Sequence, residues 1–430
     1  MYRFLQILFW SVISAAFIGP GTVTTAASSG AHFHFSLIWA LVFSTTACLI
    51  LQEASARLTI ISGKTLGQAL KTHFPSGIKK IFTVLVIVGA ILLGCAAYEA
   101  GNILGGVAGF SLISDISREN ITLLMGMFAV LLLWFGNTRY IAQLLGGLVA
   151  LMGLAFLATA LMLQPSFPAI LSASFIPSSP EGSGLYILGL IGTTVVPYNL
   201  FLGSGLAVGA KIKDMRFGLS IAIIFGGIIS IAVLIVGTSV SGQFSFQALA
   251  AALSSKLGQW AGIFFAVGLL AAGFSSAITA PLAAAITARS IFENGNQKEW
   301  HETGWKYRSI WMAVLLTGVV VGISGFKPIP IIIVAQALNG VLLPMVAIFL
   351  FLMINNRKLM GNTDINGALS NIFMVLIVLT CVLLGTFNLI KAGSASFGFA
   401  PFTESTLLLI SSGIALLLAI PIYSIFRKNR

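Results

Sequence analysis

The sequence predicts an all-α protein that crosses a membrane with eleven or twelve helices. Hydrophobic residues make up 58% of the chain and charged residues only 8%, and the mean hydropathy is +1.03. The apolar content lies above, and the charged content below, the range of ordinary soluble domains. Apolar runs of about 20 residues, the length that crosses roughly 30 Å of hydrocarbon, recur along the chain. Two of these runs contain an interruption of glycine or proline.

Each apolar run is long enough to form one membrane helix. In chain order the runs cover residues 4–27, 37–57, 80–104, 119–136, 140–163, 184–210, 216–238, 258–288, 308–325, 328–354, 369–391 and 405–426. The connectors between them are too short for a separate soluble domain. The connector 164–183 contains four prolines, so we expect it to form an irregular external cap.

The basic residues predict the orientation of the chain. Of the 23 lysines and arginines, 19 fall on the side that carries both termini if there are twelve helices. The other side keeps Arg118, Lys256, Lys327 and Lys391. Because basic residues near helix ends stay in the cytoplasm, we expect a multi-pass protein of the cell inner (plasma) membrane with both termini cytoplasmic. The net charge of +12 therefore reflects topology and attraction to lipid, and it does not imply nucleic acid.

The interruptions are residues 19–22 (Gly-Pro-Gly-Thr) and residues 193–197 (Thr-Thr-Val-Val-Pro). Unwound backbone at membrane depth is tolerated where it lines a cavity or is buried in protein. One interruption opens each half of the chain, which is typical of secondary transporters built from two inverted repeats of five helices, with the substrate site between the breaks. The expected divisions are a first repeat over 1–163, the external connector 164–183, a second repeat over 184–354, and two further helices within 355–430.

Glutamates at membrane depth are candidates for function, because an ionisable group there is costly to keep. Glu99 lies well inside the third run and is a candidate for proton coupling, with a structural hydrogen-bonding role as the alternative. Glu53 precedes Arg57 by four residues, which places both on one helix face. This pair is either a structural ion pair near the cytoplasmic end of the helix or a gate.

Sequence motifs of enzymes are missing from the chain. It has no H-E-x-x-H, no G-x-S-x-G and no P-loop, and its four histidines all lie in connectors. The three cysteines are far apart and lie in apolar helices, where we expect them to be packing residues. We therefore expect no enzyme and no cofactor.

Short sequence motifs occur in a fixed order along both halves of the chain. They include Ile18 to Thr22, Ser29-Gly30-Ala31, Ala56-Arg57-Leu58, Tyr98-Glu99, Val196 to Leu202, Ser275 to Thr279, Ala335-Gln336 and Arg357 to Gly361. This series resembles the natural resistance-associated macrophage protein (NRAMP) family of metal transporters over nearly the whole chain. The resemblance implies a leucine-transporter-type 5+5 inverted repeat with broken helices 1 and 6. It also implies transport of a metal cation by alternating access, coupled to protons.

The side chains that bind metal in this family are absent from the matching positions. The family's Asp and Asn of helix one correspond to Gly19 and Thr22, and its Met and His of helix six correspond to Val196 and Tyr198. No side chain is therefore assigned as a metal ligand. By position alone, Thr22 and the backbone near Thr193 are the equivalents.

The chemistry of these residues leaves two classes of substrate open. A hydrated divalent cation could be held by carbonyl, hydroxyl and amide oxygens, since hard cations accept such ligands whereas soft metals favour thioether and imidazole. A small organic acid or amino acid could instead use the free amides at the start of the half-helix after Gly19. The predicted substrate-binding residues are Gly19, Gly21, Thr22, Thr193, Thr194, Val196, Asn199 and Gln336. Ser276 could either line the path or pack the helices.

Overall fold

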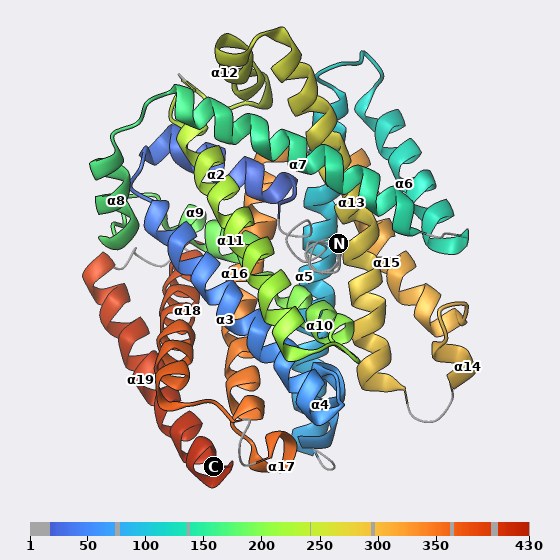
Figure 1. Ribbon diagram of the computed structural model, residues 1–430, viewed down its shortest axis with the longest axis vertical. Coiled ribbons are helices and arrows are strands. Elements are labelled where there is room, and N and C mark those ends of the chain that lie inside the picture. The colour runs from blue at the N-terminus through green and yellow to red at the C-terminus, as the bar shows by residue number, and fades with distance from the viewer. Residues whose placement is uncertain are drawn as a thin grey trace.

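The computed structural model describes residues 18–73, 78–135, 138–240, 242–293, 297–361, 365–396 and 403–429. Regular structure in these ranges is helical, and most of the helices run lengthwise through the molecule (Figure 1). The first predicted helix is described from Ile18 onward. Its earlier part, including residues 4–17, lies outside the described residues.

The helices follow the predicted apolar runs, with short helices between them. The first half holds α2 (Pro20–Phe33), α3 (Ile38–Ser62), α4 (Leu66–His73), α5 (Ile78–Phe110), α6 (Arg118–Phe135), α7 (Thr138–Met162) and α8 (Phe167–Phe175). The second half holds α9 (Gly184–Thr194), α10 (Pro197–Leu206), α11 (Ile212–Gly237), α12 (Phe246–Leu257), α13 (Gln259–Phe292), α14 (Gln297–Trp300), α15 (Trp305–Ile323) and α16 (Pro328–Ile354). The chain ends with α17 (Arg357–Met360), α18 (Ala368–Ser396) and α19 (Glu404–Asn429).

Eleven helical segments of the described residues are long and apolar enough to cross a membrane. The segment Gly184–Leu206 among them comprises α9 and α10 together. The 14-residue helix α2 adds the described part of the first predicted helix. The predicted number of eleven or twelve membrane helices is therefore confirmed.

The two halves pack by the same pattern of helix pairs. α2 packs along α11, and its counterpart α10 packs along α3. Likewise α5 packs against α16, and the counterpart α13 packs against α7. The pair α5 and α13 joins the halves near the middle of the molecule (Figure 1). Each pairing maps onto another when the halves are exchanged, as expected of two repeats related by a pseudo-two-fold axis.

Burial separates inner helices from peripheral ones. In α2 every residue from Pro20 to Gly30 is buried, and in α10 every residue from Pro197 to Ser204. By contrast, α6 and α19 expose large apolar side chains, among them Met127 and Leu409. In a membrane protein such faces meet lipid, so the half-helices of the two breaks form the interior.

The connector 164–183 departs from the prediction of an irregular cap, because it contains the helix α8. Ser166 caps this helix by accepting a hydrogen bond from the backbone N–H of Ala169 at 3.4 Å. Pro168 lies in the first turn, where a residue without an N–H costs no helical hydrogen bond. The prolines therefore start this helix where we had expected them to prevent one.

Candidate functional site

The second break is a two-residue gap between α9 and α10. Val195 and Val196 leave the helical conformation, with φ/ψ of −106°/78° and −79°/121°. Pro197 causes the gap, because its ring disfavours a helical conformation at the preceding residue and it has no N–H to donate to the carbonyl of Thr193. The carbonyl of Thr193 is thereby freed from the helical hydrogen-bond pattern. The break predicted in the sixth apolar run is confirmed.

The first break ends at Pro20, the first residue of α2. Gly19 is extended, with φ/ψ of −102°/−175°, and its carbonyl accepts the first helical hydrogen bond, from Val23 N–H at 3.2 Å. Proline is favoured at the first position of a helix, as at Pro197 in α10, because the N–H it lacks would have no partner within the helix. The half of the helix that comes before this break lies outside the described residues.

The two breaks meet through Thr22 and Thr193. Their hydroxyl oxygens lie 2.8 Å apart in a buried hydrogen bond that joins residues 171 positions apart in the sequence. The neighbouring Thr194 differs, because its hydroxyl donates to the carbonyl of Leu190 within α9 at 2.9 Å. Val196 is buried and offers an apolar side chain. The contact between Thr22 and Thr193 thus joins the first break to the second.

Three further helices surround the first break. A Cβ atom on Gly21 would lie 2.3 Å from Nε2 of Gln336 in α16, so any larger residue would have to displace this amide. A Cβ atom on Gly19 would lie 3.2 Å from Oγ of Ser276 in α13 and 3.6 Å from the hydroxyl of Tyr98 in α5. The structure therefore brings the predicted Gly19, Gly21, Thr22, Thr193 and Gln336 together.

Tyr98 and Tyr198 are neighbours of the site that sequence reasoning did not assign to it. Their rings meet edge to face, with centroids 5.4 Å apart, and both are buried. This contact joins α5 of the first half to α10 of the second. Tyr98 directly precedes Glu99 in one of the short sequence motifs, which was the available signal. Ser276, for which two roles were open, lies next to Gly19.

Several polar side chains near the breaks have no hydrogen-bond partner among the described residues. They include Oδ1 of Asn199, Oγ of Ser276, and both Oε1 and Nε2 of Gln336. All three residues are at most 2% exposed. A buried polar atom without a partner costs free energy, about 1–3 kcal/mol, so such a concentration is typical of a place where a ligand completes the hydrogen bonds.

Glu99 lies beside this site and faces another helix. It is fully buried, and its Oε2 accepts a hydrogen bond from Nδ2 of Asn102 at 3.4 Å. A Cβ atom on Gly318 of α15 would lie 2.7 Å from its Cγ, so α15 covers it closely. In the described part of the chain Glu99 forms no ion pair, and its Oε1 has no hydrogen-bond partner.

Glu53 and Arg57 form the predicted pair, with Arg57 Nε and Glu53 Oε1 3.0 Å apart. The structure adds Arg216 of α11, whose Nη2 lies 2.8 Å from the same carboxylate oxygen. Arg57 also donates to Oδ1 of Asn366, in the connector before α18. Sequence reasoning missed Arg216 and Asn366, because nothing in the spacing of distant residues indicates such contacts. The resulting cluster ties α3 to α11 and to the C-terminal helices.

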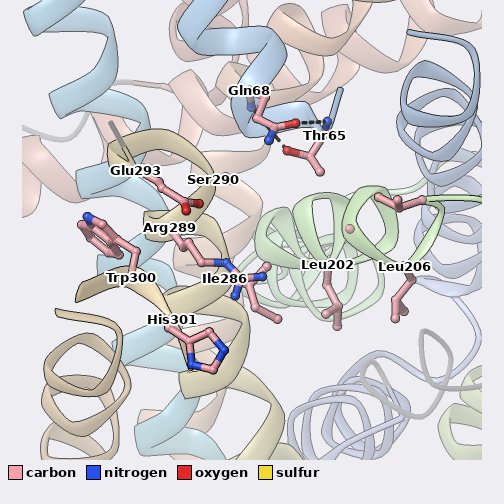
Figure 2. A pocket seen from close by; sticks show the side chains of 12 residues that line it. Thr65, Gln68, Leu202, Leu206, Ile286, Arg289, Ser290, Glu293, Trp300 and His301 are labelled. Carbon is pink, nitrogen blue, oxygen red and sulfur yellow. Dashed lines mark hydrogen bonds between the residues drawn. The ribbon is translucent and has the colours of Figure 1, made fainter. Parts of the chain in front are cut away.

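A cavity of about 420 Å³ lies at the far end of α10 from its break. Figure 2 shows its lining, with Leu202 and Leu206 of α10 on one side and Ile286, Arg289 and His301 across from them. Gln68 and Thr65 at the start of α4 close the third side (Figure 2). The cavity is a feature of the end of the molecule that carries α4, α14 and α17 (Figure 1).

Known proteins resemble this chain over most of its length. A model of the family described as natural resistance-associated macrophage protein-like (Nramp) matches residues 11–391. The divalent metal cation transporter MntH of Klebsiella pneumoniae subsp. pneumoniae is 25% identical over 369 residues, covering 82% of this chain and 86% of its own.

Solved structures share the fold. The manganese transporter of Eremococcus coleocola, solved with an aromatic bis-isothiourea compound, aligns with a TM-score of 0.73 at 18% identity and covers 99% of this chain and 93% of its own. Mhp1, a nucleobase-cation-symport-1 family transporter, aligns with a TM-score of 0.56 at 16% identity, over 98% and 92%. The predicted leucine-transporter-type fold with a 5+5 inverted repeat is confirmed.

Proposed function

Because the chain belongs to the natural resistance-associated macrophage protein-like (Nramp) family, we propose that it is a secondary transporter that moves a metal cation across the membrane by alternating access. The observation that carries the proposal is the contact between Thr22 and Thr193, which brings the breaks of both repeats to one buried place. In this architecture a substrate binds between the breaks, and one set of helices rocks against the rest to open either side. The relatives named as metal transporters support a cation as substrate.

A cation suits the surroundings of the breaks better than an organic acid does. The side chains that meet there are hydroxyls and amides of Thr22, Thr193, Ser276 and Gln336, together with the phenol of Tyr98. None of these carries a positive charge that would pair with a carboxylate. An organic acid, which the sequence alone left open, would find no positively charged side chain among these residues. The relatives named as metal transporters do not favour it either.

Proton coupling is part of the proposal and rests on Glu99. An ionisable group buried in a membrane helix without an ion pair is costly to keep and is therefore a candidate for function, and it can exchange a proton only when its environment changes. Rocking of α10, whose Tyr198 contacts Tyr98 next to Glu99, against the remaining helices would provide such a change. We assign Glu99 as the residue that exchanges the coupled proton, in a metal and proton symport.

The orientation follows from the position of the basic side chains. Lys64, Lys298 and Arg357 lie near α4, α14 and α17, at the end of the molecule that also holds the C-terminus (Figure 1). We assign this end to the cytoplasm, with both termini on that side of the plasma membrane. The cavity at the end of α10 then opens toward the cytoplasm, and the cluster of Glu53 with its two arginines would restrain α3 and α11 there. The repeats are assigned to 1–163 and 184–354.

Uptake into proteoliposomes tests this function. Purified protein should accumulate Mn²⁺ or Mg²⁺ at a rate that saturates with concentration and that an inward proton gradient increases. Thr22→Val should weaken the uptake, whereas Thr159→Val should leave it unchanged, because the Thr159 hydroxyl bonds within α7 to the carbonyl of Ala155. Uptake that never saturates would indicate a channel, and the lack of any cation uptake would refute the proposal.

A further inference from the structure

The cavity at the end of α10 is lined by charged and apolar side chains from α4, α10, α13 and α14. We propose that it binds the headgroup of an aminophospholipid, a membrane lipid that carries a phosphate and a primary amine. The site lies apart from the two breaks, and its test does not depend on cation transport. Three features of the cavity support this ligand: its charges, its apolar wall and its position.

Two opposite charges from the end of α13 line the cavity. Glu293 follows Arg289 by four positions, the spacing of neighbours on a helix surface. Neither side chain forms an ion pair within the described part of the chain. Figure 2 shows both at the cavity, with the guanidinium of Arg289 directed toward α10. A ligand with a phosphate and an ammonium group would neutralise both charges at once.

Neighbouring residues position these two charges separately. The guanidinium carbon of Arg289 lies 5.5 Å from the ring centre of Tyr307 in α15, a cation–π contact that orients the charge without neutralising it. The ammonium of Lys71 donates to the backbone carbonyl of Glu293 at 2.8 Å and ties the end of α13 to α4. The carboxylate of Glu293 accepts no hydrogen bond from a described residue, so it is available to the amine of a ligand.

The opposite wall of the cavity is apolar and belongs to α10 and the residues after it. Leu202, Leu206 and Val208 line it, together with Ile286 of α13. Gly205 adds free space, since a Cβ atom there would meet Cγ2 of Ile286 at an ordinary 3.9 Å. Val208 is 64% exposed and extends the apolar surface out of the cavity. The glycerol and acyl parts of a lipid would cover this surface, whereas a small hydrophilic zwitterion would leave it in water.

The cavity lies at the ends of two membrane-spanning segments, where lipid headgroups meet a protein. Leu206 ends the segment Gly184–Leu206, and Glu293 directly follows the segment Gln259–Phe292. Trp305, at the start of α15, is 64% exposed, and tryptophan is enriched at the headgroup level of membranes. The cavity volume of about 420 Å³ falls within the range of ligand pockets. A headgroup therefore fits there while its acyl chains stay in the hydrocarbon.

Lipid retention by the purified full chain tests the site. Delipidated protein in detergent is mixed with phosphatidylethanolamine, phosphatidylcholine or phosphatidylglycerol of the same acyl chains, and native mass spectrometry measures the bound lipid. We expect phosphatidylethanolamine to be retained about fivefold more than the others, because the quaternary amine of phosphatidylcholine donates no hydrogen bond and phosphatidylglycerol has no amine. Equal retention of the three lipids, or a preference for phosphatidylglycerol, would overturn the proposal.

Soluble phosphoethanolamine distinguishes a lipid from a free ligand of the same chemistry. We expect phosphatidylethanolamine to raise the thermal midpoint of the protein, because a bound lipid would join α10 to α13. Phosphoethanolamine at the same concentration should leave the midpoint unchanged, since it lacks the parts that cover the apolar wall. An equal shift from the soluble compound would show that the cavity takes a free zwitterion, and the lipid assignment would be wrong.

Substitutions in the cavity locate the bound lipid. Glu293→Gln should abolish the preference for phosphatidylethanolamine over phosphatidylglycerol, and Arg289→Gln should lower retention of both. Gly205→Leu improves the helix propensity of α10 and fills the cavity, so it should also lower retention of phosphatidylethanolamine. Gly147→Leu in α7 is the matched control, because a Cβ atom on Gly147 meets no described atom within 4 Å. Unchanged retention in both Glu293→Gln and Gly205→Leu would place the lipid elsewhere and overturn the proposal.

Discussion

The hydroxyl groups of Thr22 and Thr193 share a buried hydrogen bond of 2.8 Å, although one belongs to the first helix of the first repeat and the other to the first helix of the second repeat. We expect Thr22→Val and Thr193→Val each to raise the KM for cation uptake about fivefold, because one oxygen ligand is lost and a net hydrogen bond is worth about 1 kcal/mol. The double variant should lose less than the product of the two effects, since they share one contact. Fully multiplicative effects would show that the two threonines act independently.

Gly21 and Gly192 should respond differently to alanine. A Cβ on Gly21 meets the amide of Gln336, the end of a flexible side chain, so Gly21→Ala should fold and lose uptake by about tenfold as the amide is displaced. A Cβ on Gly192 would lie 1.9 Å from the backbone carbonyl oxygen of Gln336, and this backbone atom cannot move aside as a side chain can. We therefore expect Gly192→Ala to lower the thermal midpoint strongly. Size-exclusion profiles and thermal unfolding in detergent distinguish the two, and equal stability of both variants would contradict this description of the packing.

Glu99→Gln should separate transport from proton coupling. Glutamine has nearly the shape of glutamic acid and can still contact Asn102, but it cannot release a proton. We expect cation uptake down a concentration gradient to continue, within about threefold of the unmodified rate, while the stimulation by an imposed proton gradient disappears. Persistence of the full stimulation would assign the proton to another group, and Glu99 would then have a structural role.

The cluster around Glu53 predicts unequal effects of its members. Arg57 has a side chain only 8% exposed, so Glu53→Ala would leave its charge nearly buried with reduced compensation. Arg216 has a side chain 56% exposed, and exposed ion pairs contribute about 0–1 kcal/mol. Glu53→Ala should therefore destabilise the fold more than Arg216→Ala does, as measured by thermal unfolding. Equal destabilisation would mean that Asn366 and solvent stabilise the charge of Arg57 as well as Glu53 does.

Much of the fold could be predicted from hydropathy and proline chemistry. The run 328–354 was assigned with the bounds that α16 has, because an apolar run between polar ends defines a membrane helix. The second break was predicted because Pro197 cannot continue a helix. The sequence analysis did not predict helix α8, because proline stops a helix in its interior but can also stand in its first turn. Here the hydroxyl of Ser166 caps the helix, and Pro168 lies in that first turn.

The candidate site was predicted only in part. Local chemistry predicts the glycines and threonines at the breaks, because glycine and proline interrupt a helix. Ser276 and Tyr98 belong to motifs of the sequence, but their contact with Gly19 depends on how α13 and α5 pack against the first break, and no local pattern predicts that packing. The same holds for Arg216, which reaches Glu53 across 163 positions of the sequence. These contacts depend on how the repeats dock, which is a tertiary property.

The central claim, that the two breaks meet at one transport site, is tested most directly by a cross-link between Thr22→Cys and Thr193→Cys in a chain whose native cysteines are replaced by alanine. Two oxygens 2.8 Å apart place the substituted sulfurs within reach of a disulfide bond. The account predicts that mild oxidation forms this bond, stops cation uptake by holding the two half-helices together, and that reduction restores uptake. Two thiols that stay free under oxidation, or a bond that forms while uptake continues unchanged, would contradict it.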